Sequence, residues 1–163
     1  MVALLLSGTD PAARFFAELA ASNSATATLQ RRCAEPIVAE VDRNVVKPAT
    51  DDIREALAAD KETLIAYRAV KLKCGDIIFS HAENWYRPDR LSAAMNAQLL
   101  GDAPFGAVIS SLKPTRKTIE IVRVEREGII VRHRALVVSG NGIPLAQVIE
   151  NYTAAVLAEP VQP

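Results

Sequence analysis

The chain has 163 residues, of which 50% are apolar and 23% are charged, a balance typical of one globular domain spanning residues 1–163. Lys plus Arg and Asp plus Glu both number 19, so the chain has no net charge at pH 7. This neutrality gives no general electrostatic case for nucleic acid or an anionic membrane, although a local basic patch remains compatible with it. No apolar run approaches the length of a membrane span.

The first half of the chain predicts helices that begin at capping residues and strands of alternating polarity. Thr9 or Asp10 can cap a helix with Pro11 in its first turn, and Thr50 suits the cap of a second helix. The predicted elements are a helix from Pro11 to about Ser22, a strand over Ala25–Cys33, an apolar run of undetermined class over Pro36–Val46, a short helix over Thr50–Leu57 and a strand over Leu64–Cys74.

The second half is dominated by strands that tight turns connect. Gly75, Gly128 and Asn141-Gly142 mark these turns, because glycine and asparagine tolerate positive φ. The pattern predicts strands over 77–86, 117–127, 129–139 and 143–152, a helix over 92–100 and a short helix from Ala103-Pro104-Phe105-Gly106 to about Leu112. Consecutive strands with helices mainly before and between the hairpins predict an α+β domain on an antiparallel sheet.

Cysteine and histidine are sparse. Cys33 and Cys74 form no CxxC pair, which favours two buried thiols in a reducing compartment over a disulfide or a metal site. The predicted location is therefore the cytoplasm. His81 and His133 form no ligand-spaced cluster, which argues against a catalytic zinc. Each falls on an apolar strand face and is interpreted as a neutral core histidine.

Arg68 is the first candidate for chemistry. With a period of two it shares the apolar face of the Leu64–Cys74 strand, whereas Lys71 and Lys73 lie on the other face. An arginine keeps its charge, so on an inward face it requires an anion from the protein or from a ligand. A structural ion pair with an inward carboxylate is the commoner explanation. An acidic ligand is the alternative.

Two further sites could act with Arg68. Glu150, on the last strand, can work as acid, base or partner of a hydroxyl if it points inward, or it can simply neutralise Arg68. A helix that begins at Phe105-Gly106 presents free backbone N–H groups, which can hold a carboxylate or represent an ordinary helix start. No serine or cysteine carries a nucleophile motif, and no phosphate-loop pattern is present.

Five short motifs in order resemble the chorismate pyruvate-lyase family and, more distantly, the effector-binding domain of GntR-type transcription regulators. They are Asp10-Pro11-Ala12-Ala13-Arg14-Phe15-Phe16, Arg68-x-Val70-x-Leu72, Ala103-Pro104-Phe105-Gly106, Thr115-Arg116-x-x-Ile119-Glu120-Ile121, and Pro144-Leu145 leading to Glu150-x-Tyr152. Together they span nearly the whole chain.

The resemblance implies a cofactor-free carbon–oxygen lyase that converts chorismate to 4-hydroxybenzoate and pyruvate, which family members supply to ubiquinone biosynthesis. It also implies a chorismate lyase-like antiparallel sheet that encloses a pocket for an aromatic acid. Arg68 would grip the ring carboxylate, the backbone amides near Ala12 and at Phe105 would add donors, and Glu150 would meet the ring hydroxyl or handle the migrating proton.

This chain departs from the family pattern at two positions of the implied pocket. Asn84 stands where the family has a second arginine, and Arg87 or Arg116 could supply the missing charge; Ala12 replaces a larger side chain. The competing hypotheses are a non-catalytic sensor domain for a small aromatic carboxylate and a structural interaction domain in which Arg68 is an ion-pair partner. The sequence gives no prediction of the oligomeric state.

Overall fold

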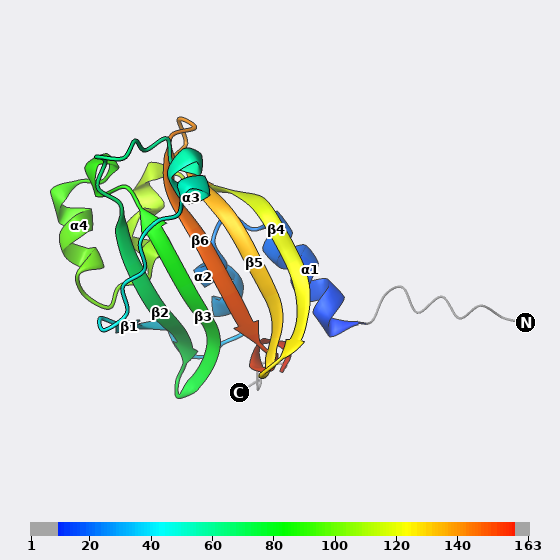
Figure 1. Ribbon diagram of the computed structural model, residues 1–163. Coiled ribbons are helices and arrows are strands. Elements are labelled where there is room, and N and C mark those ends of the chain that lie inside the picture. Colours follow the sequence, from blue (N-terminus) through cyan, green and yellow to red (C-terminus); the bar gives the residue numbers. More distant parts are fainter. Residues whose placement is uncertain (1–9, 159–163) are drawn as a thin grey trace, which may run out of the picture.

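A six-stranded antiparallel sheet of order β1-β2-β3-β6-β5-β4 organises the protein (Figure 1). The computed structural model describes residues 10–158. The strands are β1 (Val38–Asp42), β2 (Ala66–Cys74), β3 (Ile77–Tyr86), β4 (Thr115–Arg126), β5 (Ile129–Val138) and β6 (Pro144–Thr153). The predicted α+β class with an antiparallel sheet is confirmed.

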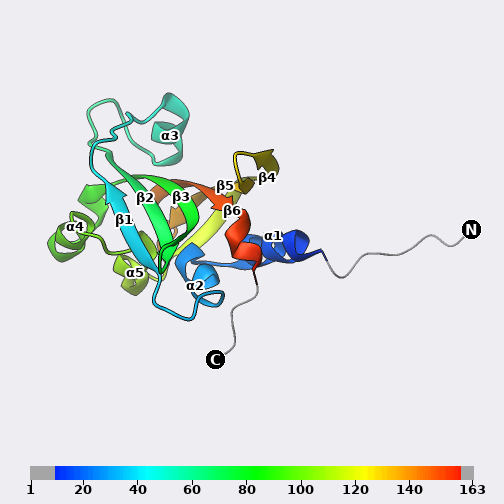
Figure 2. The ribbon, with the colours of Figure 1, turned by 90° about the horizontal axis from the view of Figure 1, so that it is seen from below.

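The helices divide unequally between the two faces of the sheet. Figure 2 shows α3 alone on one side, with α1, α2, α4 and α5 on the other. The helices are α1 (Pro11–Ala21), α2 (Ala25–Gln30), α3 (Asp51–Ala56), α4 (Ala93–Leu99) and α5 (Phe105–Val108), with 3-10 turns η1 (Pro88–Arg90), η2 (Ser110–Leu112) and η3 (Ala154–Leu157).

The chain path brings the C-terminal strand into the middle of the sheet. After β3 the chain crosses through α4 and α5 to the far edge, where β4 begins, and β5 and β6 then return. β6 pairs with β3, placing Ala82 opposite Glu150. Because β3 also pairs with β2, residues of β2 and β6 lie two strands apart although about 80 positions separate them in sequence.

Most predicted elements are confirmed, including the cap at Asp10, whose side chain accepts from the amide of Ala12; Thr9 lies outside the described residues. The predicted strand over Ala25–Cys33 is wrong, because this segment begins as helix α2. Ser24 caps α2 by accepting from the Ala27 amide, and Ala25, Thr28 and Leu29 are buried. That burial follows helical spacing, which the alternation of Ala and Thr in the sequence concealed.

The two faces of β2 differ as the alternation predicts, with one exception at its start. Val70 and Leu72 are buried beneath the helices, whereas Leu64 precedes the strand and is 72% exposed. On the other face Tyr67 packs on Trp85, which belongs to a small core under α3. This face is therefore partly covered.

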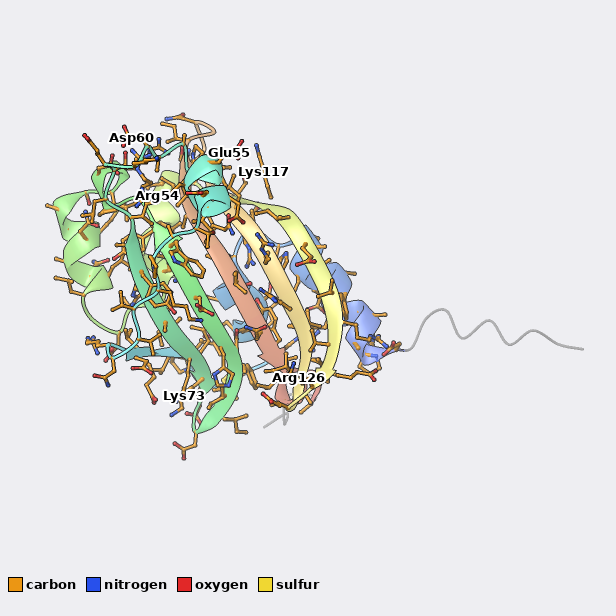
Figure 3. All side chains as sticks on the ribbon, in the orientation of Figure 1. Arg54, Glu55, Asp60, Lys73, Lys117 and Arg126 are labelled. Atoms are coloured by element: carbon orange, nitrogen blue, oxygen red, sulfur yellow. A yellow bond between two sulfur atoms is a disulfide. The ribbon has the colours of Figure 1, made fainter. Side chains whose placement is uncertain are left out.

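Arg54 of α3 stabilises the turn that follows this helix. The guanidinium of Arg54 donates to the carbonyl oxygen of Asp60 at 2.7 Å and to that of Thr63 at 3.0 Å. Figure 3 labels Arg54 and Asp60 at this end of the sheet, with Lys73 and Arg126 at the opposite end. These side chains lie on the periphery of the fold.

The expectation of two free thiols is wrong, because Cys33 and Cys74 form a disulfide with their Cα atoms 5.7 Å apart. The turn after α2 brings Cys33 beside the end of β2, a proximity that a sequence separation of 41 does not reveal. Disulfides persist mainly in oxidising compartments. The thiol-based reason for a cytoplasmic location therefore no longer holds, and the location itself stays a prediction.

The predicted burial of His81 is also wrong. Lys73 pairs with Ile78 and Leu72 pairs with Ser80, so Phe79 is an extra residue in β3. This bulge interrupts the alternation, and His81 is exposed rather than buried with Phe79. The interpretation of His81 as a core histidine is therefore wrong.

Candidate functional site

A cavity of about 50 Å³ lies between the helix-covered face of the sheet and the segments at the starts of α2 and α5. Every strand of the sheet contributes to its wall. The lining residues are Asn23, Ser24, Ala25, Thr26, Ala39, Arg68, Val70, Leu72, Ala82, Asn84, Pro104, Phe105, Gly106, Ile109, Pro114, Arg116, Val137, Val148 and Glu150. The wall is mainly apolar, with a few polar side chains among the strand residues.

Arg68 points inward from β2, as the alternation predicts, and is only 4% exposed. Its Nη2 donates to the carbonyl oxygens of Gly101 and Ala103, at 3.0 Å each. Its Nε and Nη1 are buried and have no hydrogen-bond partner among the described residues. No carboxylate of the described residues forms a salt bridge with Arg68, and burial lowers the pKa of its guanidinium. The charge of Arg68 thus has no counter-ion within residues 10–158.

Asn84 lies directly across from Arg68 in the β2–β3 pairing. It is buried and lines the same cavity. Cross-strand partners project to the same face of a sheet, so Asn84 enters the cavity wall from the position next to Arg68. The neighbour of Arg68 on this strand is therefore uncharged.

Glu150 also points inward, at 5% exposed, but its partner is Arg116 rather than Arg68. Arg116 Nη2 donates to Glu150 Oε2 at 2.5 Å, and the Tyr152 hydroxyl donates to the same oxygen at 2.6 Å. Burial disfavours the charge of Arg116, yet the neighbouring Glu150 and Tyr152 outweigh it and raise the pKa of Arg116. The interpretation of Glu150 as the counter-ion of Arg68 is therefore wrong.

His133 completes this network behind the cavity. The side chain is fully buried on β5; its Nε2 lies 2.9 Å from Thr118 Oγ1 and its Nδ1 lies 3.1 Å from Arg116 Nη2. Burial, and then the positive charge of Arg116, lower the pKa of His133. A neutral imidazole is thus favoured, and its Nδ1 can accept from Arg116. The core-histidine interpretation holds for His133, which also positions Arg116.

The other predicted site residues divide into those that line the cavity and those that do not. Phe105 and Gly106 line it, and no backbone carbonyl of the described residues accepts from their amides. Ala12 does not line it, and its amide donates to the side chain of Asp10, the cap of α1. The assignment of Ala12 to the site stays a prediction.

Arg87 and Arg116 were alternative sources of a second positive charge. Arg87 donates to both carboxylate oxygens of Asp89 and to the carbonyl oxygens of Leu57 and Ala58, so it is bound within the structure and does not line the cavity. Only Arg116 reaches the cavity, and its charge is matched by Glu150.

Tyr152 and His133 are the residues that the sequence did not assign to the site. Tyr152 stands two positions after Glu150, so both project to one face of β6, and this spacing could have identified it. His133 is paired with Glu150 across β5 and β6, and no local pattern reveals that pairing. Among the described residues, no cluster of three or more His, Cys, Asp or Glu side chains could hold a metal ion.

No helix within residues 10–158 is long and apolar enough to cross a membrane. No protein-family model matches the chain.

Solved structures show what the fold resembles. The effector domain of PhnF from Mycobacterium smegmatis superposes with a TM-score of 0.60 at 9% identity, covering 81% of this chain and 89% of that one. The ligand-binding domain of a putative GntR-family regulator from Bordetella bronchiseptica gives 0.53 at 10% identity, covering 72% and 86%. The possible transcriptional regulator YydK from Bacillus subtilis gives 0.54 at 14% identity, covering 78% of this chain and only 62% of YydK. The fold is that of GntR effector domains and chorismate lyase.

One curated relative is similar in sequence as well. The uncharacterized protein y4mC from Sinorhizobium fredii is 35% identical over a 175-position alignment that covers 88% of this chain and 74% of y4mC. The chain therefore belongs to the same protein family as y4mC, with the chorismate lyase-like fold of GntR effector domains.

Proposed function

We propose that the cavity binds a small aromatic carboxylic acid, with Arg68 as the residue that holds the carboxylate. The observation that carries the proposal is the buried guanidinium whose Nε and Nη1 have no partner within the described residues. A native protein rarely leaves buried donors unsatisfied, and water or a ligand commonly explains the exceptions. A carboxylate would both supply the hydrogen bonds and balance the charge.

The rest of the wall suits a flat apolar ring. Val70, Ala82 and Val148 form its sheet side, and Phe105 closes it from α5. Ligand sites are typically apolar cavities with a small number of placed polar groups. On the sheet these groups are Arg68, Asn84 and the Arg116–Glu150 pair, and Asn23, Ser24 and Thr26 add polar side chains at the start of α2.

The cavity must enlarge to admit a ring. Its volume is about 50 Å³, whereas an apolar cavity of about 150 Å³ is known to bind benzene. An outer depression of about 490 Å³ shares Asn23, Ser24, Thr26, Gly106 and Pro114 with it. The start of α2 and the start of α5 thus separate the cavity from the depression, and a small outward shift of either element would join the two spaces.

Cleavage of chorismate to 4-hydroxybenzoate and pyruvate is the activity that we propose for such a site. The C3–O bond to the enolpyruvyl group breaks, the C4 proton leaves, the ring becomes aromatic, and the released enol becomes pyruvate on protonation at its methylene carbon. Aromatisation supplies the driving force, so the protein has chiefly to bind, desolvate and orient the substrate. Glu150 Oε1 has no hydrogen-bond partner within residues 10–158 and belongs to a residue that lines the cavity, so it is the base available for the C4 proton.

A non-catalytic sensor of aromatic acids is the second candidate, and the two hydrogen bonds to Glu150 favour it. Arg116 and Tyr152 both donate to Oε2 of Glu150, so one of the two carboxylate oxygens is already occupied by the protein. The Bordetella bronchiseptica domain of this fold is described as ligand-binding, which agrees with a sensing role.

Two measurements on the purified chain test these proposals. Calorimetric titration with 4-hydroxybenzoate should show binding, and Arg68→Met should weaken it by about 100-fold, because about two charge-assisted hydrogen bonds are lost. Arg126→Met, which removes an exposed arginine from β4, is the matched control and should bind like the wild type. Absorbance of 4-hydroxybenzoate formed from chorismate then separates enzyme from sensor.

Binding unchanged in a folded Arg68→Met variant would refute the proposed carboxylate site. Binding without any product above the spontaneous background would refute the lyase and leave the sensor.

A further inference from the structure

The formal charges that line the cavity sum to plus one. Arg68, Arg116 and Glu150 are the charged residues in its wall within the described part of the chain. Arg116 and Glu150 form an ion pair at 2.5 Å and cancel each other. His133, behind them, is favoured as neutral, since burial and Arg116 both lower its pKa. The single uncompensated charge belongs to Arg68.

Groups just outside the cavity do not change this sum. Arg43 and Asp102 lie near enough to influence Arg68, but they pair with each other at 3.1 Å and are largely exposed. The contacts of Arg68 to Gly101 and Ala103 are to carbonyl oxygens, which carry no net charge. On the adjacent strand Asn84 offers a neutral amide.

We propose that the cavity selects ring acids with a single negative charge, and that Asn84 is the residue that determines this specificity. The inference rests on the proposed carboxylate site and defines the class of its ligands. One carboxylate balances Arg68. A second would be desolvated beside the uncharged side chains of the wall, or would face Glu150, and neither position offers it a cation.

The second polar group of the ligand is therefore neutral. Glu150 Oε1 has no partner among the described residues and accepts from a hydroxyl or an amide, whereas a carboxylate at the same place would be repelled. The same rule ranks 4-hydroxybenzoate, a monoanion, above chorismate, a dianion, in affinity, so a lyase with this cavity binds its product more tightly than its substrate.

A pair of probes of equal shape isolates the charge. Terephthalate carries two carboxylates, and 4-carbamoylbenzoate replaces one of them by a neutral amide. Calorimetric titration at pH 7.5, where every carboxyl group of both probes is ionised, should give a dissociation constant about tenfold lower or more for 4-carbamoylbenzoate. The ratio of the two constants reports selectivity, and the affinity of 4-carbamoylbenzoate alone reports the underlying site.

Two variants change the cavity charge with almost no change in side-chain size. Asn84→Asp brings the sum of the cavity charges to zero by adding a carboxylate at the position across from Arg68, and should weaken binding of 4-carbamoylbenzoate by about tenfold or more. Glu150→Gln raises the sum of the cavity charges to plus two, because Arg116 loses its carboxylate partner. The dissociation constant of terephthalate, divided by that of 4-carbamoylbenzoate, should then fall by about tenfold. Circular dichroism verifies that both variants are folded.

The possible results distinguish charge selection from the underlying carboxylate site. If wild-type protein binds terephthalate as tightly as 4-carbamoylbenzoate, or if folded Glu150→Gln keeps the wild-type ratio, charge selection is refuted while the carboxylate site stands. If neither probe nor 4-hydroxybenzoate binds, the carboxylate site itself is refuted, and charge selection is refuted with it.

Discussion

Reduction of the Cys33–Cys74 disulfide should destabilise the protein without unfolding it in buffer. The bond joins the turn after α2 to the end of β2, and these are the only two cysteines in the chain. Dithiothreitol therefore changes one defined covalent link. No other residue is altered, so the comparison isolates the effect of that link.

The size of the effect follows from the length of the loop that the bond closes. The two cysteines are 41 positions apart, and cross-linking a loop of that length lowers the entropy of the unfolded chain enough to stabilise the fold by about 4 kcal/mol. Domains are typically stable by about 5–15 kcal/mol, so the reduced form should remain folded. With a urea dependence of about 2 kcal/mol per M, the midpoint should fall by about 2 M.

Urea titrations followed by circular dichroism, with and without dithiothreitol, measure this shift. A Cys33→Ala/Cys74→Ala double variant is the control, and its midpoint should lie near that of the reduced wild type and be insensitive to dithiothreitol. Because Ala25 and Thr26 of α2 line the cavity, reduction should also weaken 4-hydroxybenzoate binding. A wild-type midpoint that does not respond to dithiothreitol would show that the loop-entropy reasoning, or the bond itself, is wrong.

Two further changes test the network behind the cavity. Tyr152→Phe removes a buried hydroxyl that donates to Glu150 and should lower the free energy of unfolding by about 2 kcal/mol. The control Tyr67→Phe removes a half-buried hydroxyl that donates to Glu83 and should lower it by about 1 kcal/mol or less. Equal losses in urea titrations would contradict the network. The pKa of His133 is lowered in the fold, so the unfolded chain binds the proton more readily and stability should fall as the pH drops below about 6.5, by up to about 1.4 kcal/mol per unit. His133→Gln should lose this part of the pH dependence between pH 7.5 and 5.5, and an unchanged profile would exclude His133 as its source.

Local patterns were enough to predict most of the secondary structure and the orientation of Arg68. The period of two on β2 placed Arg68 inward because apolar neighbours and lysines alternate there without interruption. The same reasoning failed at His81, where a bulge around Phe79 shifts the alternation by one residue. It also failed at Ala25–Cys33, where threonine and alanine alternate but Ser24 caps a helix.

Contacts between distant strands could not be predicted in this way. Glu150 was known to be a candidate, yet its pairing with Arg116 depends on how β4, β5 and β6 align, and β4 contains its own register shift. The disulfide depends likewise on the path of the chain after α2.

By itself, the sequence determined the α+β class, the antiparallel hairpins and the inward position of one arginine, since each depends on neighbours within a few residues. Only the tertiary structure decided that this arginine has no counter-ion within the described residues, that Glu150 is already paired, and that the two cysteines are bonded. The physical reason is that ion pairing and disulfide formation depend on distances of a few ångströms between segments that are 34 to 41 positions apart, and only the folded chain fixes those distances.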